Sequence, residues 1–332
     1  MDKKKSAVFD VSEKEILQVG IVVGDVVKTA KQYSKIFGIG PWAFFDGVGS
    51  DYILHGRPIN EESAIRMGLA KLGRLEIELL QPLWGPSSHR EFLQTRGEGV
   101  HHLSFDVVEN RGEFVAALKG HGIEVEMEAS VDGAYTASYM STRKQLGTIF
   151  EALEVISEDA YSKMTPWGIY EPQGPGIINL AGKEIVQVGI VTDNAEKMAG
   201  NYEEIFGIGP WEFMEFKHPE AVGHNWHGVT FTQSDDSLIR AAFANIGSLQ
   251  IELLEPVTGA GTHMEFLKTK GVGVHHISFD FIDDYREVVA ALEKNGIDSE
   301  MDGSMQVEGE TLAFNYLDTR CVLGTILEVV GL

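Results

Sequence analysis

Apolar and polar positions along the chain show two periodicities, that of a helix and that of a strand, and the segments of each kind come in a fixed order. An apolar, β-branched run at 16–23 leads through Asp25, a suitable helix N-cap, into helical spacing that ends at Gly38. Strand-like runs and a short helix follow, and then the same order begins again. For the first half the pattern predicts helices at 25–38, 90–95 and 111–120, and strands at 16–23, 42–45, 64–70, 75–80, 100–107, 123–128, 135–140 and 148–153.

The second half of the 332-residue chain repeats this order. "ILQVGIVVGDVVKTAKQYSKIFGIGPW" (16–42) is matched by "IVQVGIVTDNAEKMAGNYEEIFGIGPW" (185–211), and "GVHHLSFDV" (99–107) by "GVHHISFDF" (273–281). We therefore expect an α+β chain of four βαβββ units. The expected boundaries are an N-terminal tail at 1–14, a first domain at 15–156, a linker at 157–183 where Pro and Gly interrupt the periodicity, and a second domain at 184–332.

Composition narrows the classes of partner. A formal charge of −23 disfavours nucleic acids and anionic membranes, and no apolar run approaches the roughly 18–20 residues that span a bilayer. The single cysteine, Cys321, excludes an internal disulfide framework and indicates a reducing cytoplasm. We expect a small-molecule substrate, possibly anionic, and either a monomer or a homodimer.

Strand alternation separates the two histidines of the repeated strand. In "HHLSFDV", His102 and Ser104 share one face, while His101 shares the other with Leu103 and Phe105. The apolar face should pack under a helix, which leaves His102 on the polar, concave side. His101 is then expected to be a packed or hydrogen-bonded structural histidine.

Comparison of the two halves selects the polar residues that recur. Glu76 and Glu78 share a strand face, but only Glu78 has a carboxylate opposite it in the second half, where Glu76 is replaced by Gln250. In the same way Glu151 recurs in the second half, whereas the position equivalent to Glu154 is occupied by Gly331. The recurring set is Gln18, Glu78, His102 and Glu151, followed by Gln187, Glu252, His276 and Glu328.

Carboxylates inside apolar strands are costly unless something compensates their charge. A divalent cation is a natural compensator, and imidazole with oxygen ligands suits zinc, nickel, cobalt or manganese. The alternative is a set of buried groups that satisfy one another through hydrogen bonds.

At these residues the chain resembles the vicinal oxygen chelate superfamily, which includes glyoxalase I, methylmalonyl-CoA epimerase, extradiol dioxygenases and bleomycin-resistance proteins. The resemblance covers nearly everything except the N-terminal dozen residues and the linker. It implies two glyoxalase-like domains with curled mixed sheets around metal clefts, and ligands on the first and fourth strands of each unit. Those positions are the eight recurring residues named above.

Different motifs resemble different branches of this superfamily. "FGIGPW", "IELLQP" and "GVHHLSFD" look like the epimerase branch, whereas Gln, Glu, His and Glu is the ligand set of eukaryotic glyoxalase I. The arginine with which glyoxalase I grips glutathione is replaced here by Val22 and Val191, and the second base of the epimerase has no clear match. Gln in place of a first histidine argues against an extradiol dioxygenase.

The resemblance and the residues together indicate a metal-dependent isomerase, epimerase or lyase that moves a proton next to a carbonyl through an enediolate or enolate. Glu151 and Glu328 are the expected general bases, and Glu78 and Glu252 could return the proton. Candidate substrate-binding residues are Arg66, Arg240, Tyr139 and Tyr316, whereas His89 and His263 are expected to be surface or capping groups. A non-catalytic binding protein of the bleomycin-resistance kind is the rival interpretation.

Two pairings of the units would both make two clefts. The units of one half could face each other, or each half could contribute to both clefts. Pairing within a half is favoured, because it closes shorter loops. If that is right, residues 1–160 alone should bind one metal as a monomer.

Overall fold

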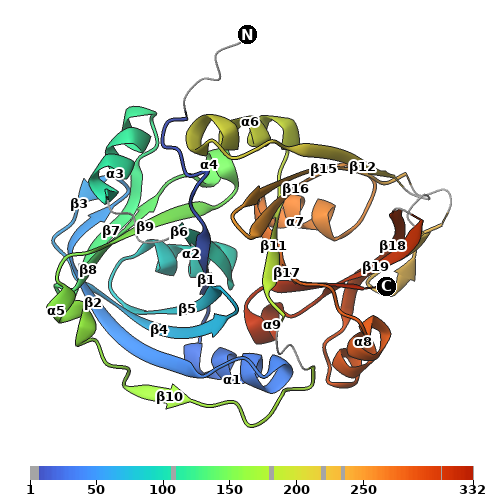
Figure 1. Ribbon diagram of the computed structural model, residues 1–332, viewed down its shortest axis with the longest axis horizontal. Helices are drawn as coiled ribbons and strands as arrows, with labels where there is room; N and C mark the ends of the chain where they lie inside the picture. Colours follow the sequence, from blue (N-terminus) through green and yellow to red (C-terminus); the bar gives the residue numbers. More distant parts are fainter. Residues whose placement is uncertain are drawn as a thin grey trace.

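Two curled β-sheets lie side by side, each partly surrounded by helices (Figure 1). The computed structural model describes residues 7–105, 110–178, 183–217, 222–232, 236–307 and 309–331. The end of the predicted strand at 106–107 and parts of the predicted tail and linker lie outside these residues. Within the described ranges, no helix is long and apolar enough to cross a membrane.

The first sheet closes into a barrel. Its strands run in the order β10-β2-β4-β5-β1-β6-β9-β8-β7, and β7 pairs with β2, so that eight strands form a ring. Short strand β3 (Arg57–Pro58) pairs with β2 outside this path. The bounds are β1 Ile16–Val22, β2 Trp42–Leu54, β4 Ser63–Leu72, β5 Leu75–Trp84, β6 Gly99–Phe105, β7 Val125–Val131, β8 Tyr135–Met140, β9 Ile149–Val155 and β10 Gly168–Tyr170.

The second sheet has the same plan but stays open within the described residues. Its order is β12-β15-β16-β11-β17-β20-β19-β18-β13-β14, where β12 and β13 take the places of the two ends of β2. The bounds are β11 Ile185–Val191, β12 Glu212–Lys217, β13 Val222–Trp226, β14 Val229–Thr230, β15 Leu238–Ile246, β16 Leu249–Thr258, β17 Gly273–Phe279, β18 Ser299–Val307, β19 Glu310–Leu317 and β20 Ile326–Gly331.

Each sheet is built from one half of the chain. At its centre β1 is parallel to β5, β6 is parallel to β9, and β1 and β6 are antiparallel. The second half repeats these pairings with β11, β16, β17 and β20. Strand pairing therefore confirms that the units face each other within a half.

The helices begin and end where local chemistry stops them. In α1 (Val26–Phe37) the Asp25 side chain accepts a hydrogen bond from the Lys28 amide, and Gly38 ends the helix with a φ of 69°. Helix α3 (Arg111–Gly120) has the bounds predicted from the sequence. The remaining helices are α2 Ser88–Arg96, α4 Arg143–Leu146, α5 Glu158–Ser162, α6 Ala195–Phe206, α7 Thr262–Lys270, α8 Tyr285–Lys294 and α9 Arg320–Leu323.

One hydrophobic core extends across both halves. The Tyr33 hydroxyl on α1 donates to the Leu323 carbonyl (3.0 Å), and the corresponding Tyr202 hydroxyl on α6 donates to the Leu146 carbonyl (2.7 Å). These matched contacts give the interface an approximate two-fold symmetry. The halves are structurally joined even though their sheets are separate.

Segments that precede each half cross to the other half. The Val8 and Phe9 amides donate to carbonyls of α6, and Val11 is buried in the shared core. In the same arrangement the Ile177 and Ile178 amides of the linker donate to carbonyls of α1. The described part of the predicted tail is thus attached to the second half, and the linker adds strand β10 to the first barrel.

Candidate metal centres

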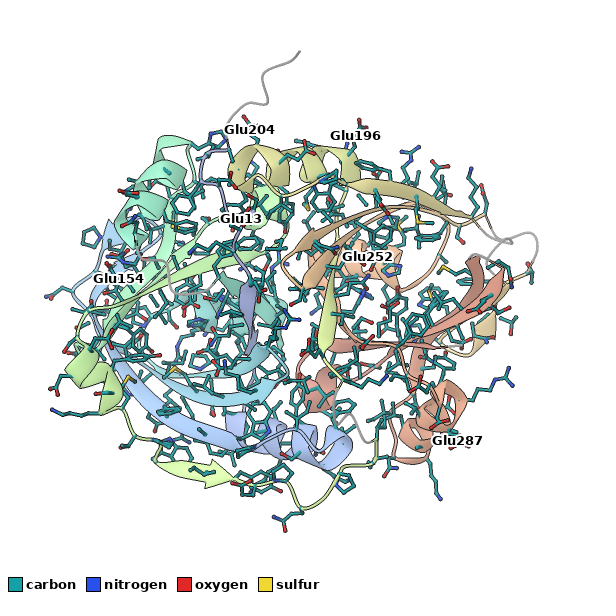
Figure 2. All side chains as sticks on the ribbon, in the orientation of Figure 1. Glu13, Glu154, Glu196, Glu204, Glu252 and Glu287 are labelled. Carbon is teal, nitrogen blue, oxygen red and sulfur yellow. The ribbon has the colours of Figure 1, made fainter. Side chains whose placement is uncertain are left out.

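The recurring polar residues lie on the four central strands of each sheet. Gln18 is on β1, Glu78 on β5, His102 on β6 and Glu151 on β9, and all except Gln18 are buried. In the second half Gln187, Glu252, His276 and Glu328 occupy the corresponding places, and Figure 2 shows Glu252 within the second sheet. Glu154, whose equivalent position in the second half is not a carboxylate, instead forms an ion pair with Arg111 at 2.9 Å.

A glycine makes room for each central histidine. Gly20 lies opposite His102 in the register of β1 and β6, and a Cβ placed on Gly20 would come within 2.1 Å of the imidazole. Gly189 and His276 repeat this relation at 2.0 Å. The imidazole therefore lies flat across the neighbouring strand, where only a glycine fits.

Three side-chain atoms converge inside the first barrel. His102 Nε2 lies 3.3 Å from Glu78 Oε2 and 3.4 Å from Glu151 Oε2. Each of these three atoms is buried and has no hydrogen-bond partner in the described part of the chain. In the second half the separations from His276 Nε2 are 3.3 Å to Glu252 Oε2 and 3.5 Å to Glu328 Oε2.

Burial makes this arrangement electrostatically demanding. It raises the pKa of Glu78 to about 7, and it does the same for Glu328. Burial also opposes charge on His102, but the negative charges of Glu151 and Glu78 outweigh this effect and raise its pKa. A positive charge between the carboxylates, either a proton or a cation, is needed to stabilise the group.

In the second half, a hydrogen-bond chain determines which histidine nitrogen is free. The Thr262 hydroxyl donates its proton to the Glu300 carboxylate, which also lies 2.8 Å from Arg320. Because that proton is used, the Thr262 hydroxyl oxygen accepts a hydrogen bond from His275 Nε2 at 2.9 Å. Burial lowers the pKa of His275 well below its ordinary value, so the imidazole is neutral and its Nδ1 is an acceptor.

His275 Nδ1 therefore accepts from His276 Nδ1, 3.1 Å away. This leaves His276 Nε2 to face Glu252 and Glu328 with a lone pair whenever the imidazole is neutral. A cation would satisfy all three groups at once, and the hydrogen bond on the other nitrogen holds the ring in the orientation that a metal ligand needs.

His101 does not follow simple alternation. The register of β1 and β6 shifts between Gly20 and Ile21, so that His101 has no partner on β1 and forms a β-bulge. It is buried, as expected for a packed histidine, but its Nδ1 lies 3.2 Å from His102 Nδ1. The bulge thus turns both histidines toward the same interior.

His89 and His263 are buried, so the expectation that they are surface or capping groups was wrong. His89 lies on α2, with its ring centroid 4.5 Å from that of His101, and His263 on α7 repeats this contact at 4.7 Å. Their recurrence in both halves was the signal that could have identified them. Each half therefore has a histidine cluster whose ligand atoms lie within 4.8 Å of one another, namely His89, His101 and His102, and His263, His275 and His276.

Tyr139 and Tyr316 lie beside the central histidines. Their ring centroids are 5.1 Å from that of His102 and 5.0 Å from that of His276, respectively. Burial, together with the charge of Glu151, holds the pKa of Tyr139 well above its ordinary value, so its hydroxyl is a hydrogen-bond donor. Tyr139 lines a cavity of about 60 Å³ together with Gln18, Glu78 and Glu151.

Arg66 and Arg240 lie away from these interiors. On β4 the neighbours Ile65 and Met67 line the cavity, so Arg66 points outward, where it forms two hydrogen bonds of 2.7 Å with Asp46. Arg240 is exposed and lies 3.2 Å from Glu215. Alternation explains this outcome: each arginine follows a residue that faces the interior.

Gln18 is close to the group but has a hydrogen bond of its own. Its Nε2 donates to Glu76 Oε1 at 2.9 Å, and Gln187 donates to Gln250 at 2.8 Å. Glu76, which the comparison of the halves had set aside, therefore positions the glutamine side chain.

These donors fit a divalent cation. Donors bound to one ion at about 2.0–2.2 Å lie roughly 3.0–3.6 Å apart, a range that includes the four separations between histidine and glutamate. Orphaned carboxylate oxygens and an imidazole nitrogen are also the expected donor types for such an ion.

The sequence matches the family described as the Glyoxalase/Bleomycin resistance protein/Dioxygenase superfamily, over residues 17–139 and again over residues 186–314. The two stretches together make up more than half of the chain. The chain belongs to this superfamily. The resemblance noted from the twin-histidine strands is therefore confirmed, and the two matches agree with the two sheets.

The similarity to one curated relative covers only part of the chain. The uncharacterized protein YqjC of Bacillus subtilis (strain 168) is 29% identical over 92 residues, which are 28% of this chain and 53% of that protein. The chain therefore spans about half the length of this curated relative.

Among solved structures, a mutant of 4-hydroxymandelate synthase from Streptomyces coelicolor has a TM-score of 0.58 at 14% identity, over 96% of this chain and 92% of that chain. This likeness concerns the fold. The Mn(II)-bound glyoxalase from Novosphingobium aromaticivorans has a TM-score of 0.48 at 13% identity, over 96% and 81% of the two chains.

Proposed function

We propose that each half binds one divalent cation, and that the chain is a metal-dependent isomerase, epimerase or lyase that moves a proton next to a carbonyl. The observation that carries this proposal is the convergence, in the first half, of a buried imidazole nitrogen and two buried carboxylate oxygens that have no hydrogen-bond partner among the described residues. In the second half His276 Nε2 and Glu252 Oε2 are in the same state, and Glu328 Oε2 lies 3.5 Å from His276 Nε2. The ligands in the first half are Gln18, Glu78, His102 and Glu151, and those in the second are Gln187, Glu252, His276 and Glu328.

When bound, the cation supplies a Lewis acid that favours negative charge on a substrate oxygen. Glu151, or Glu328 in the second half, accepts the proton from the adjacent carbon, and Glu78 or Glu252 returns it. Before a cation binds, burial raises the pKa of Glu78 and of Glu328 to about 7, so each half has one carboxyl that can hold a proton. Each half pairs one such carboxyl with a second glutamate.

Tyr139 and Tyr316 hold the substrate in this proposal. Each retains its proton and lies against the central histidine, where it donates a hydrogen bond to a substrate oxygen. The limited space in the first barrel favours a compact substrate. Arg66 and Arg240 have no part in this proposal, because both point away from the interior.

Metal analysis and hydrogen exchange test the proposal together. The purified chain should hold about two divalent ions, and the metal-loaded chain in heavy water should incorporate deuterium next to the carbonyl of one compound in a panel of hydroxyketones, keto-sugars and thioesters. Changing both Glu151→Gln and Glu328→Gln should abolish the exchange.

Glu154→Gln is the matched control, because this carboxylate lies three residues further along the same strand and pairs with Arg111 instead. It should leave exchange unchanged. A chain that binds a panel compound but holds no transition metal would instead support the non-catalytic binding protein.

A further inference from the structure

A second, larger pocket lies between the two halves, with a volume of about 650 Å³. It is lined by equivalent residues from both halves, among them Phe92 with Phe266 and Thr148 with Thr325. None of the eight proposed metal ligands lines it. A volume of this size is typical of sites for small organic molecules.

The lining of this pocket contains more cations than carboxylates, although the chain as a whole is acidic. Although the formal net charge is −23, four cations line the pocket: Arg96 and Arg143 from the first half, and Lys270 and Arg320 from the second. The two carboxylates of the lining are already engaged. Glu98 accepts from the Gly24 amide at 2.8 Å, and Asp318 lies 2.9 Å from Arg320.

Two of the four cations form no ion pair within the described part of the chain. Arg96 Nη1 donates to the Val272 carbonyl at 3.1 Å, and Lys270 Nζ donates to the Arg96 carbonyl at 2.8 Å. Both hydrogen bonds cross between the halves, so they hold the charged groups at the junction while leaving their charge uncompensated.

Arg143 is also only partly compensated. It lies 3.7 Å from Glu126, beyond hydrogen-bond distance, and over the ring of Phe92 at 5.1 Å. Burial lowers the pKa of Arg143 to about 10, and the positive charge of Arg96 contributes to this. A positive potential at the junction follows, and an oxyanion would relieve it.

We propose that the pocket between the halves binds a small organic molecule with an oxyanion group at each end, such as a bisphosphate or a dicarboxylate. Each half contributes one pair of cations, Arg96 with Arg143 and Lys270 with Arg320, so two anionic groups match the approximate two-fold symmetry. Arginine binds such groups through parallel hydrogen bonds. Arg320 already pairs with Glu300 at 2.8 Å and Asp318 at 2.9 Å, so Lys270 supplies the uncompensated charge at its end of the pocket. None of these four side chains is a proposed metal ligand, so an anion can bind here without a cation in either barrel.

Cys321 provides a direct test of location, because it is the single cysteine of the chain, is exposed and lines this pocket. Fructose 1,6-bisphosphate and glutarate, each tested against chloride at equal ionic strength, serve as probes. We expect at least one to bind in isothermal titration and to slow the reaction of Cys321 with a thiol reagent. Which one binds distinguishes phosphate from carboxylate.

Lys270→Gln and Arg96→Gln should each weaken this binding roughly tenfold or more. The exposed side chain of Lys270 makes its replacement safe for folding, and Arg57→Gln, at an exposed position in β3, is the control that removes equal charge. Binding should also persist in the His102→Ala/His276→Ala variant.

Three results would overturn the proposal: no binding of either probe at millimolar concentration, equal binding by Lys270→Gln and wild type, or loss of binding in the double histidine variant. The last result would assign the probe to the barrels. Failure of the metal proposal would leave these measurements unaffected.

Discussion

Gly20 and Gly189 show how strictly a single residue can determine the geometry of these centres. An added methyl group at Gly20 would lie 2.1 Å from the His102 ring, which is fully buried. Gly20→Ala should therefore displace His102 and reduce the metal content by about one ion per chain, with the second half still loaded. Metal analysis after gel filtration measures this.

Gly112→Ala is the matched control, because a Cβ at Gly112 in α3 meets nothing within 4 Å. It should keep both ions and raise the free energy of unfolding by about 0.5–1 kcal/mol, since alanine favours a helix more than glycine does. Full metal content in Gly20→Ala would show that His102 is not a ligand.

The two adjacent histidines should respond differently to truncation. His102→Ala with His276→Ala should abolish metal binding, because each removes the nitrogen that faces two carboxylates. His101→Ala with His275→Ala should mainly destabilise the chain, by about 1–3 kcal/mol for each buried ring, and loosen the metal by freeing the neighbouring imidazole. Chelator competition and thermal unfolding separate the two effects. If the His101/His275 variant lost the metal and the His102/His276 variant kept it, the ligands would be His101 and His275 instead.

The sequence predicted these residues to the extent that simple periodicity holds. Alternation and comparison of the halves selected Glu78, His102 and Glu151, which the structure brings together. Neither could reveal the bulge at His101, because a bulge depends on pairing with another strand rather than on local composition. The glycine in the apolar strand "QVGIV", repeated in both halves, was the available sign of a close approach.

At the scale of elements, order was easier to predict than extent. All the predicted strands and helices of the first half are present, but β2 runs to Leu54 rather than ending at 45. Its far end pairs with β7 and closes the barrel, a contact between distant segments that local pattern does not encode. Strand β10 was missed for the same reason, since a strand of three residues in a Pro- and Gly-rich linker has no periodicity of its own.

Trp167 attaches this linker strand to the barrel. Its ring stacks on Phe44 at 5.3 Å, lies under Arg66 at 4.8 Å, and donates through Nε1 to Asp46 at 3.0 Å. Trp167→Ala should lower the free energy of unfolding by about 1 kcal/mol and speed proteolysis in the linker, without changing the metal content.

Arg66→Gln should act in the same direction and more weakly, by about 0.5–1 kcal/mol, because the ion pair with Asp46 is partly exposed. Chemical unfolding and limited proteolysis check both variants. Loss of catalytic exchange in Arg66→Gln, with stability unchanged, would restore it as a substrate-binding residue.

At the scale of the whole molecule, the halves are separate in their sheets but shared in their core. Phe37 meets Phe279 at 5.5 Å between ring centroids, and the equivalent Phe206 meets Phe105 at 5.4 Å. With the crossed segments before each half, these contacts form an interface that one half cannot cover alone. Sequence comparison showed the duplication, but it could not show that duplicated surfaces face each other.

This shared core changes what the isolated first half should do. Residues 1–160 contain all four proposed ligands of the first barrel, so the fragment should bind about one ion per copy. It should nevertheless form a homodimer instead of the monomer that local pairing alone would suggest, because a second copy offers Phe105 to Phe37 and the Leu146 carbonyl to Tyr33 in place of their partners in the second half. Light scattering with metal analysis tests both points. A metal-loaded monomer would contradict the shared core, and a fragment that binds metal only when mixed with the second half would contradict ligand sets confined to one half.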